Sequence, residues 1–136
     1  MSNKKILIVE DDADVRLGYQ VLLKANNYDT CFAGDSTAAV REARKHQPDV
    51  ILLDLGLPAG DGFIVLERFH NIIELALIPV IVVSARATHG NKERALAAGA
   101  RAYIQKPWDD SWLLASISQI LDQPNTPRLD PTLIAS

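Results

Sequence analysis

Two apolar segments of this chain run directly into acidic residues. Residues 6–9 (Ile-Leu-Ile-Val) precede three acids at 10–12, and residues 50–53 (Val-Ile-Leu-Leu) precede Asp54. A strand buried in a parallel sheet has such a continuous apolar sequence, and open parallel sheets place their ligand sites at the carboxyl ends of the strands. If both segments are strands of one sheet, the four acids gather at one edge of it. The pattern therefore predicts an α/β fold with a cation site at that edge.

Strand-like apolar segments alternate with amphipathic, helix-like segments along the chain. This alternation is typical of a parallel sheet that is covered by helices on both faces. The predicted strands span residues 5–10, 29–33, 50–54, 79–84 and 101–104. Right-handed crossovers leave few arrangements of five such units, and known folds of this type have the strand order 2-1-3-4-5. We expect a flavodoxin-like (βα)5 sandwich in which the first and third strands are neighbours.

Apolar residues at helical spacing lie between and after these strands and indicate five helices. The stripes consist of Val15, Tyr19, Leu22 and Leu23; Ala39, Val40 and Ala43; Phe63, Leu66 and Phe69; Leu96; and Trp112, Leu113, Ile117, Ile120 and Leu121. Packing against the sheet explains all of these stripes without a cofactor. The single Cys31 lies in a strand-like segment, where the expected role is that of a small buried side chain.

The size and charge of the chain limit what it can do. Its 136 residues are 48% hydrophobic and 23% charged, which fits one soluble domain. We assign residues 1–122 to that domain and the proline-containing residues 123–136 to a tail or linker. The net charge of -3 and the scattered basic residues argue against direct binding of nucleic acid. No apolar segment approaches the ~20 residues that span a bilayer, and no signal-peptide pattern occurs, so we expect a cytoplasmic protein without membrane contact.

The acids require a partner, because carboxylates held close together raise one another's pKa values unless a cation neutralises them. Mg²⁺ suits such a site, since it prefers oxygen ligands and is commonly held by carboxylates together with a phosphate oxygen. Lys106 follows the fifth strand and could reach Asp54, and Ser84 ends the fourth strand, where its hydroxyl could donate to a phosphoryl oxygen. Ordinary alternatives are a solvated lysine, a helix N-cap at Ser84 and a helix cap within residues 10–12. Their joint placement at four strand ends favours a site for phosphoryl chemistry.

Four short motifs occur in a fixed order along the chain. They are Val9-Glu10-Asp11-Asp12, then Asp54-Leu55-Gly56-Leu57-Pro58 with Asp61-Gly62, then Ser84-Ala85, and then Tyr103 with Lys106-Pro107. This order resembles the receiver domain of bacterial two-component response regulators, and the resemblance covers residues 4 to about 121. Any one of the motifs would be a weak signal, but four in the correct order are specific.

The resemblance implies a role for each acid. Asp54 would be the phosphoacceptor, whose carboxylate takes a phosphoryl group from a histidine kinase to give an acyl phosphate. Asp11 and Asp54 would ligate Mg²⁺, or another divalent cation such as Mn²⁺, directly. The Gly56 backbone carbonyl would supply a further ligand, and Glu10 would act through water. The resemblance assigns no ligand role to Asp12, for which a cap of the first helix is the ordinary alternative.

The same resemblance implies a switch and its partners. Lys106 would stabilise charge on the phosphoryl oxygens, the Ser84 hydroxyl would move toward the phosphoryl group, and the Tyr103 ring would turn inward. Simple packing of Tyr103 at the sheet edge is the alternative. The protein would be no enzyme apart from its own phosphoryl transfer and autodephosphorylation. Its partners would be a sensor histidine kinase or phosphotransfer protein, and an output partner or effector domain at the face of the fourth helix, fifth strand and fifth helix. We expect a monomer or a weak, phosphorylation-dependent dimer.

Three other classes of protein share parts of the pattern. A pure interaction module would keep the fold without being phosphorylated, but the complete set of Asp11, Asp54, Ser84 and Lys106 argues against it. A phosphatase of the haloacid-dehalogenase type needs a second acid two residues after its nucleophile, where this chain has Gly56. A flavin-binding protein on the same fold needs a Gly/Ser/Thr-rich loop after the first strand, where the three acids would repel the phosphate.

Overall fold

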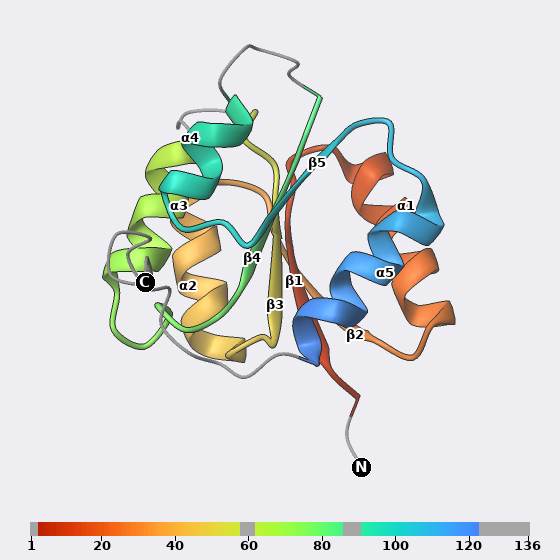
Figure 1. Ribbon diagram of the computed structural model, residues 1–136. Coiled ribbons are helices and arrows are strands. Elements are labelled where there is room, and N and C mark those ends of the chain that lie inside the picture. Colours follow the sequence, from red (N-terminus) through yellow and green to blue (C-terminus); the bar gives the residue numbers. More distant parts are fainter. Residues whose placement is uncertain (1–2, 58–61, 86–90, 123–136) are drawn as a thin grey trace.

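Five parallel strands form one sheet with helices on both faces (Figure 1). The computed structural model describes residues 3–57, 62–85 and 91–122. The strands are β1 (Lys5–Val9), β2 (Asp29–Ala33), β3 (Val50–Leu53), β4 (Val80–Ser84) and β5 (Ala102–Gln105). The helices are α1 (Ala13–Ala25), α2 (Ser36–His46), α3 (Gly62–Asn71), α4 (Asn91–Ala97) and α5 (Asp110–Leu121). The predicted strands are confirmed, with ends that differ by one residue at most.

The strand order is β2-β1-β3-β4-β5, which confirms the flavodoxin-like sandwich. In the register between β1 and β3, Ile6 lies beside Val50 and Val9 lies beside Leu53. The amide of Asp54 donates to the carbonyl of Val9 at 3.1 Å and so extends the ladder past the end of β3. Because β1 and β3 end at the same level, the acids that follow them emerge side by side.

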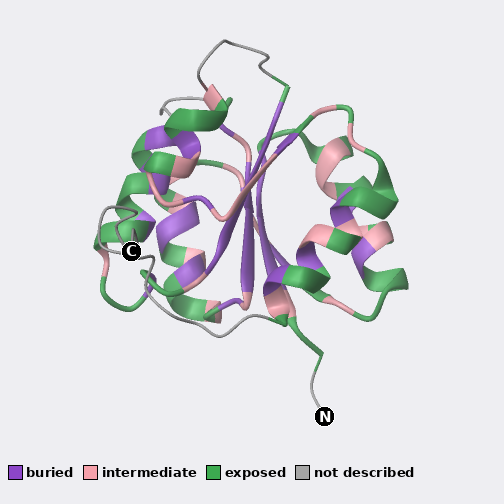
Figure 2. Ribbon diagram, in the orientation of Figure 1, coloured by how far each residue is buried: buried purple, intermediate pink, exposed green. Residues whose placement is uncertain are grey.

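The two faces of the sheet carry separate hydrophobic cores, because successive residues of a strand point to opposite faces. Ile6 and Ile8 pack with α1 and α5, whereas Leu7 and Val9 pack with α2, α3 and α4. Figure 1 shows these two groups of helices on opposite sides of the sheet, and Figure 2 shows the central strands β1, β3 and β4 between them as almost entirely buried. Burial of such a side chain stabilises the folded state by ~1.5–3 kcal/mol. The strand β1 is therefore anchored from both sides, which fixes the position of the acids at its end.

Aspartates at the strand–helix turns begin three of the helices. The side chains of Asp12, Asp35 and Asp109 each accept a hydrogen bond of 2.8 Å from a backbone amide in the first turn of α1, α2 and α5. Such an N-cap satisfies an amide that has no partner inside the helix, and its loss typically costs ~1 kcal/mol. Asp12 is thus the cap within residues 10–12, and its side chain is directed to the helix rather than to the neighbouring acids.

One helical position, Trp112, was assigned wrongly to the core. Trp112 is 66% exposed, while Leu113 and the residues at helical spacing from it, up to Ile120, are buried on the sheet. A step of one residue turns a helix by about 100°, so Trp112 and Leu113 cannot face the same surface. In α4 the buried side chain is Ala95, and its neighbour Leu96 is only half-buried.

The expected burial of Cys31 is confirmed. Its thiol is free and lies in the core under α2, and burial raises its pKa to about 11. Since the thiolate is the reactive form, this cysteine has the properties of a small apolar side chain.

Some expectations concern residues beyond the described ranges. The predicted tail at 123–136, and Pro58 and Asp61 of the second motif, lie outside the described residues. The domain boundary at residue 122 therefore remains a prediction. Among the helices that are described, none is long and apolar enough to cross a membrane.

Candidate functional site

Three carboxylates from two strand ends lie together at the carboxyl edge of the sheet. Glu10 and Asp11 follow β1 and Asp54 follows β3, and one oxygen of each lies within 4.8 Å of the others. Glu10 is buried, Asp54 is half-buried and Asp11 is exposed. We call these three residues the acidic cluster. It extends from the core to the solvent, as a site that admits a soluble ligand must.

Lys106, which follows β5, joins the buried part of the acidic cluster. Its ammonium nitrogen Nζ lies 2.7 Å from Glu10 Oε1 and 3.2 Å from Asp54 Oδ2. The backbone amide of Lys106 donates to the carbonyl of Ser84 at 2.8 Å, which ties the end of β5 to the end of β4. The lysine is therefore held at the same edge of the sheet as the acids, and it neutralises part of their charge.

Both carboxylate oxygens of Asp54 have donors. The Gly56 amide donates to Oδ1 at 2.9 Å, and Lys106 donates to Oδ2 at 3.2 Å. Burial opposes the ionisation of Asp54, but hydrogen bonds with Glu10, with the Gly56 amide and with Lys106 outweigh it and hold the pKa of Asp54 below its usual value. Asp54 is thus an ionised, oriented carboxylate at neutral pH.

Glu10 behaves in the opposite way. Its burial, together with its hydrogen bond to Asp54, raises the pKa of Glu10 from 4.5 to about 7, although Lys106 opposes the shift. The carboxyl groups of Glu10 and Asp54 lie side by side, and the more buried one, Glu10, is the one that is more easily protonated. At pH 7, without a metal ion, about half of the molecules therefore carry a proton on Glu10.

The donor set of the acidic cluster fits a small, hard cation. Three carboxylates converge, and when Glu10 is ionised its buried Oε2 has no hydrogen-bond donor in the part of the chain that the structure describes. An unsatisfied buried oxygen of this kind is costly. Mg²⁺ takes oxygen ligands and keeps several waters, which the exposed side at Asp11 can accommodate.

Ser84 and Tyr103 lie on neighbouring strands. Ser84 is the last residue of β4 and is fully buried at the edge where Lys106 emerges. Tyr103 pairs with Val82 in the sheet, two residues further from that edge, and its half-buried ring packs against the core formed with α2, α3 and α4. The structure thus brings Ser84 to the site edge and leaves Tyr103 beside it. The switch roles of both residues, and the ligand role of the Gly56 carbonyl, remain predictions.

Two contacts of the site were not predicted from the sequence. Lys106 was expected to reach Asp54, but its shorter contact is with Glu10. Tyr19 of α1 was assigned only to a core stripe, yet its ring stacks on Trp108, with 4.6 Å between centroids and 4° between planes. Trp108 lies two residues after Lys106, so the stack joins α1 to the segment that carries the lysine. No local pattern links these side chains, because only the sheet topology brings them together.

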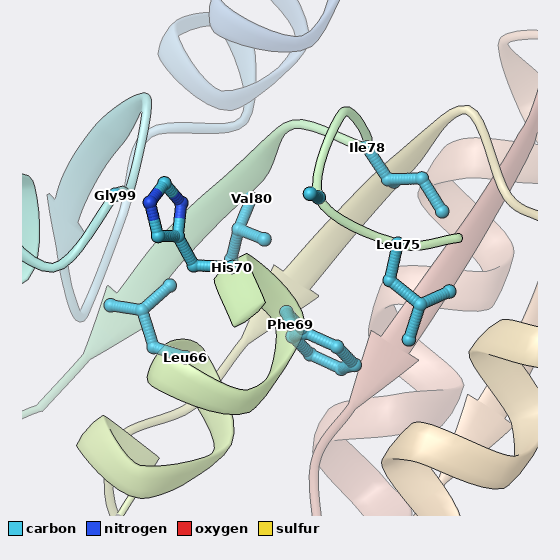
Figure 3. A pocket seen from close by; sticks show the side chains of 8 residues that line it. Leu66, Phe69, His70, Leu75, Ile78, Val80 and Gly99 are labelled. Carbon is cyan, nitrogen blue, oxygen red and sulfur yellow. The ribbon is translucent and has the colours of Figure 1, made fainter. Parts of the chain in front are cut away.

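A small hollow lies at the amino edge of the sheet, away from the acidic cluster, between the end of α3 and the start of β4 (Figure 3). Its volume is about 10 Å³, which is room for one water molecule at most. Gly99 closes one side with φ of +111°, and a Cβ there would lie 3.0 Å from His70 Nδ1. This hollow is a packing detail and offers no ligand site.

Solved structures and curated proteins share the fold and the sequence pattern. A CheY-like receiver domain from Methanospirillum hungatei has a TM-score of 0.83 and 30% identity, with 89% of this chain and 95% of that one covered. The receiver domain of the sensor histidine kinase PA1611 from Pseudomonas aeruginosa, which has a magnesium ion in its active-site cleft, has a TM-score of 0.82 and 27% identity over 90% of this chain and 100% of that one. The polar-differentiation response regulator DivK from Brucella anthropi is 38% identical over 104 residues, which are 76% of this chain and 85% of that protein.

A parallel sheet of this strand order, with acids and a lysine at its carboxyl edge, defines the class of CheY-like α/β domains. The sequence matches the response regulator receiver domain family over residues 6–118. The chain belongs to that family, and the predicted resemblance is confirmed. Receiver domains act as phosphoacceptor switches in two-component signalling, and the family binds Mg²⁺ in the active site.

Proposed function

We propose that Asp54 accepts a phosphoryl group from the phosphohistidine of a sensor kinase or phosphotransfer protein. An oxygen of the Asp54 carboxylate attacks phosphorus, the phosphorus–nitrogen bond of the donor breaks, and its electron pair returns to the imidazole. The observation that carries this proposal is the state of Asp54: an ionised, half-buried carboxylate held at both oxygens, beside a lysine and two further acids.

Other residues of the site support the transfer by binding and by charge. Asp11 and Asp54, with the Gly56 carbonyl and with Glu10 through water, would hold Mg²⁺, which supplies charge neutralisation for the incoming phosphoryl group. The Lys106 ammonium would face the phosphoryl oxygens, and the Ser84 hydroxyl would donate to one of them. Such preorganised charges stabilise the transition state of phosphoryl transfer without a separate general acid.

The phosphorylated state would be passed to an output partner or effector domain. The surface proposed for this step is the face formed by α4, β5 and α5, which is next to the site because β5 leads directly into Lys106. Ser84 and Tyr103, on the adjacent strands β4 and β5, would connect the phosphoryl group to that face. Phosphorylation would then shift an existing equilibrium between two conformations.

Intact mass spectrometry tests the proposed function. The protein is incubated with acetyl phosphate and Mg²⁺, and a parallel sample contains EDTA. We expect an adduct of ~80 Da, the mass of one phosphoryl group, that forms only with Mg²⁺. If neither acetyl phosphate nor a phosphorylated histidine kinase adds mass, the chain is an interaction module that keeps the fold without the chemistry.

Binding of Mg²⁺ is expected to depend on pH. Because the pKa of Glu10 is about 7 in the metal-free protein, a cation that needs the ionised cluster must displace a proton at low pH. The apparent affinity for Mg²⁺ should therefore be about tenfold lower at pH 6 than at pH 8 and level off above pH 8. Isothermal titration calorimetry in buffers of different ionisation enthalpy measures both the affinity and the proton release. Glu10→Gln should remove the dependence, and an equal affinity at pH 6 and 8 would refute the assignment of the proton to Glu10.

A further inference from the structure

A groove between α2 and α3 has an unusual charge. Its volume is about 520 Å³, and it lies on the flank of the molecule where these two helices pack side by side (Figure 1). The residues that line it are Thr37, Val40, Arg41, Arg44, Lys45 and Arg68. Four of the six are cations, and we call them the basic groove residues. None of them belongs to the acidic cluster.

The charge of the groove is only partly neutralised. Arg41 Nε lies 3.4 Å from Glu42, and Arg44 Nε lies 3.2 Å from Glu74. Within residues 3–57, 62–85 and 91–122, neither Lys45 nor Arg68 is paired with a carboxylate. The chain as a whole has a net charge of -3, so the sign of the charge in this groove is opposite to that of the whole chain. A concave surface of one charge sign concentrates ligands of the opposite sign.

A solvated helix face does not account for this arrangement. Arg44 and Lys45 lie in the last turn of α2, where cations are favoured by the helix dipole, and the same is true of Arg68 in α3. The helix dipole favours a cation at the end of each helix, but it does not require the cations of α2 and α3 to lie together. Like charges that line one groove repel each other. The helix dipole therefore leaves the gathering of four cations along one groove unexplained.

We propose that the groove binds an acidic segment of a partner protein. The basic groove residues are exposed and reach outward on long side chains, so they suit an extended chain of carboxylates better than a small anion enclosed by buried donors. The buried Val40 gives the groove an apolar element, and Glu42 and Glu74 stand beside the cations. Because an apolar side chain and two carboxylates interrupt the basic surface, the groove suits a peptide with acidic and other side chains better than a polyphosphate backbone, which is attracted by an uninterrupted basic surface.

This docking surface is separate from phosphoryl transfer at Asp54. Among the described residues, those that line it belong to α2 and α3, whereas the proposed output face consists of α4, β5 and α5. The groove would hold a partner in both states of the switch. It can therefore be tested with the unphosphorylated protein, and its failure would leave the proposed function of Asp54 untouched.

Fluorescence anisotropy with a fluorescein-labelled octaglutamate peptide tests the proposal at low salt. The full chain should bind octaglutamate, bind an octaglutamine peptide at least ~10-fold more weakly, and lose most of its affinity for octaglutamate in ~0.5 M salt, which screens exposed charges. The double variant Lys45→Gln/Arg68→Gln should bind octaglutamate about tenfold more weakly than the unchanged chain. The matched control Lys24→Gln/Lys92→Gln removes two exposed cations from α1 and α4 and should change the affinity less than about twofold.

Each other result would overturn the proposal. Equal weakening in both double variants would show that only net charge matters, and equal binding of the two peptides would show that carboxylates are not recognised. Tighter binding of a labelled thymidine octanucleotide, also lost in Lys45→Gln/Arg68→Gln, would assign the groove to nucleic acid. Circular dichroism spectra of both double variants confirm that they are folded before the affinities are compared.

Discussion

The Asp54→Asn protein is expected to gain no phosphoryl group from acetyl phosphate or from a histidine kinase. Asparagine has the shape of aspartate, so the Gly56 amide can still donate to its side-chain oxygen and Lys106 can keep its 2.7 Å contact with Glu10. The amide, however, has no ionised oxygen to attack phosphorus. The loss should therefore be chemical and complete, with the fold retained. Intact mass spectrometry measures it directly.

Asp12→Asn is the matched control. Asp12 lies two residues after Glu10, but its side chain caps α1, and asparagine is as good an N-cap as aspartate. This variant has the same change of charge and should take up the phosphoryl group as the unchanged protein does. An adduct on Asp54→Asn would place the phosphoacceptor elsewhere, and peptide mapping would then identify the residue.

The sheet and the acidic cluster could be predicted from the sequence because their signals are local. The apolar runs of β1 and β3 and the acids that follow them are contiguous in the chain, and crossover rules then place Glu10 and Asp54 at one edge. The parallel register, in which Val9 lies beside Leu53, converts that placement into contact. Only the strand order was taken from known folds.

Side-chain partners and helix faces were harder to predict. The contact of Lys106 with Glu10 depends on where the segment after β5 turns, and no residue pattern encodes that turn. Trp112 is exposed and Leu113 is buried because one step along a helix turns the side chain by about 100°. The basic groove could not be predicted from the order of residues along the chain, since Arg68 lies on a different helix from Arg41, Arg44 and Lys45. These features depend on tertiary packing and became clear only in the folded structure.

Gly62→Ala is expected to destabilise the domain by about 2–3 kcal/mol, because the packing at this position leaves no room for a methyl group. The Gly62 amide donates to the carbonyl of Leu55 at 3.2 Å, and an added Cβ would lie 2.7 Å from that oxygen and 2.9 Å from its carbon. These atoms are backbone, so no side chain can rotate out of the way. Leu55 directly follows Asp54, and the shift that relieves the clash would also displace the phosphoacceptor. We therefore expect slower phosphorylation as well as lower stability in urea.

Gly18→Ala separates this effect from the general effect of adding a methyl group. Gly18 lies within α1, and a Cβ there would have no atom within 4 Å. Alanine in a helix interior is favoured over glycine by ~0.5–1 kcal/mol, so this variant should gain stability while Gly62→Ala loses it. Equal shifts of the urea midpoint in the two variants would contradict the tight packing of Gly62 on Leu55. A stability loss in Gly62→Ala without slower phosphorylation, measured where both variants are folded, would show that the Leu55 backbone moves independently of Asp54.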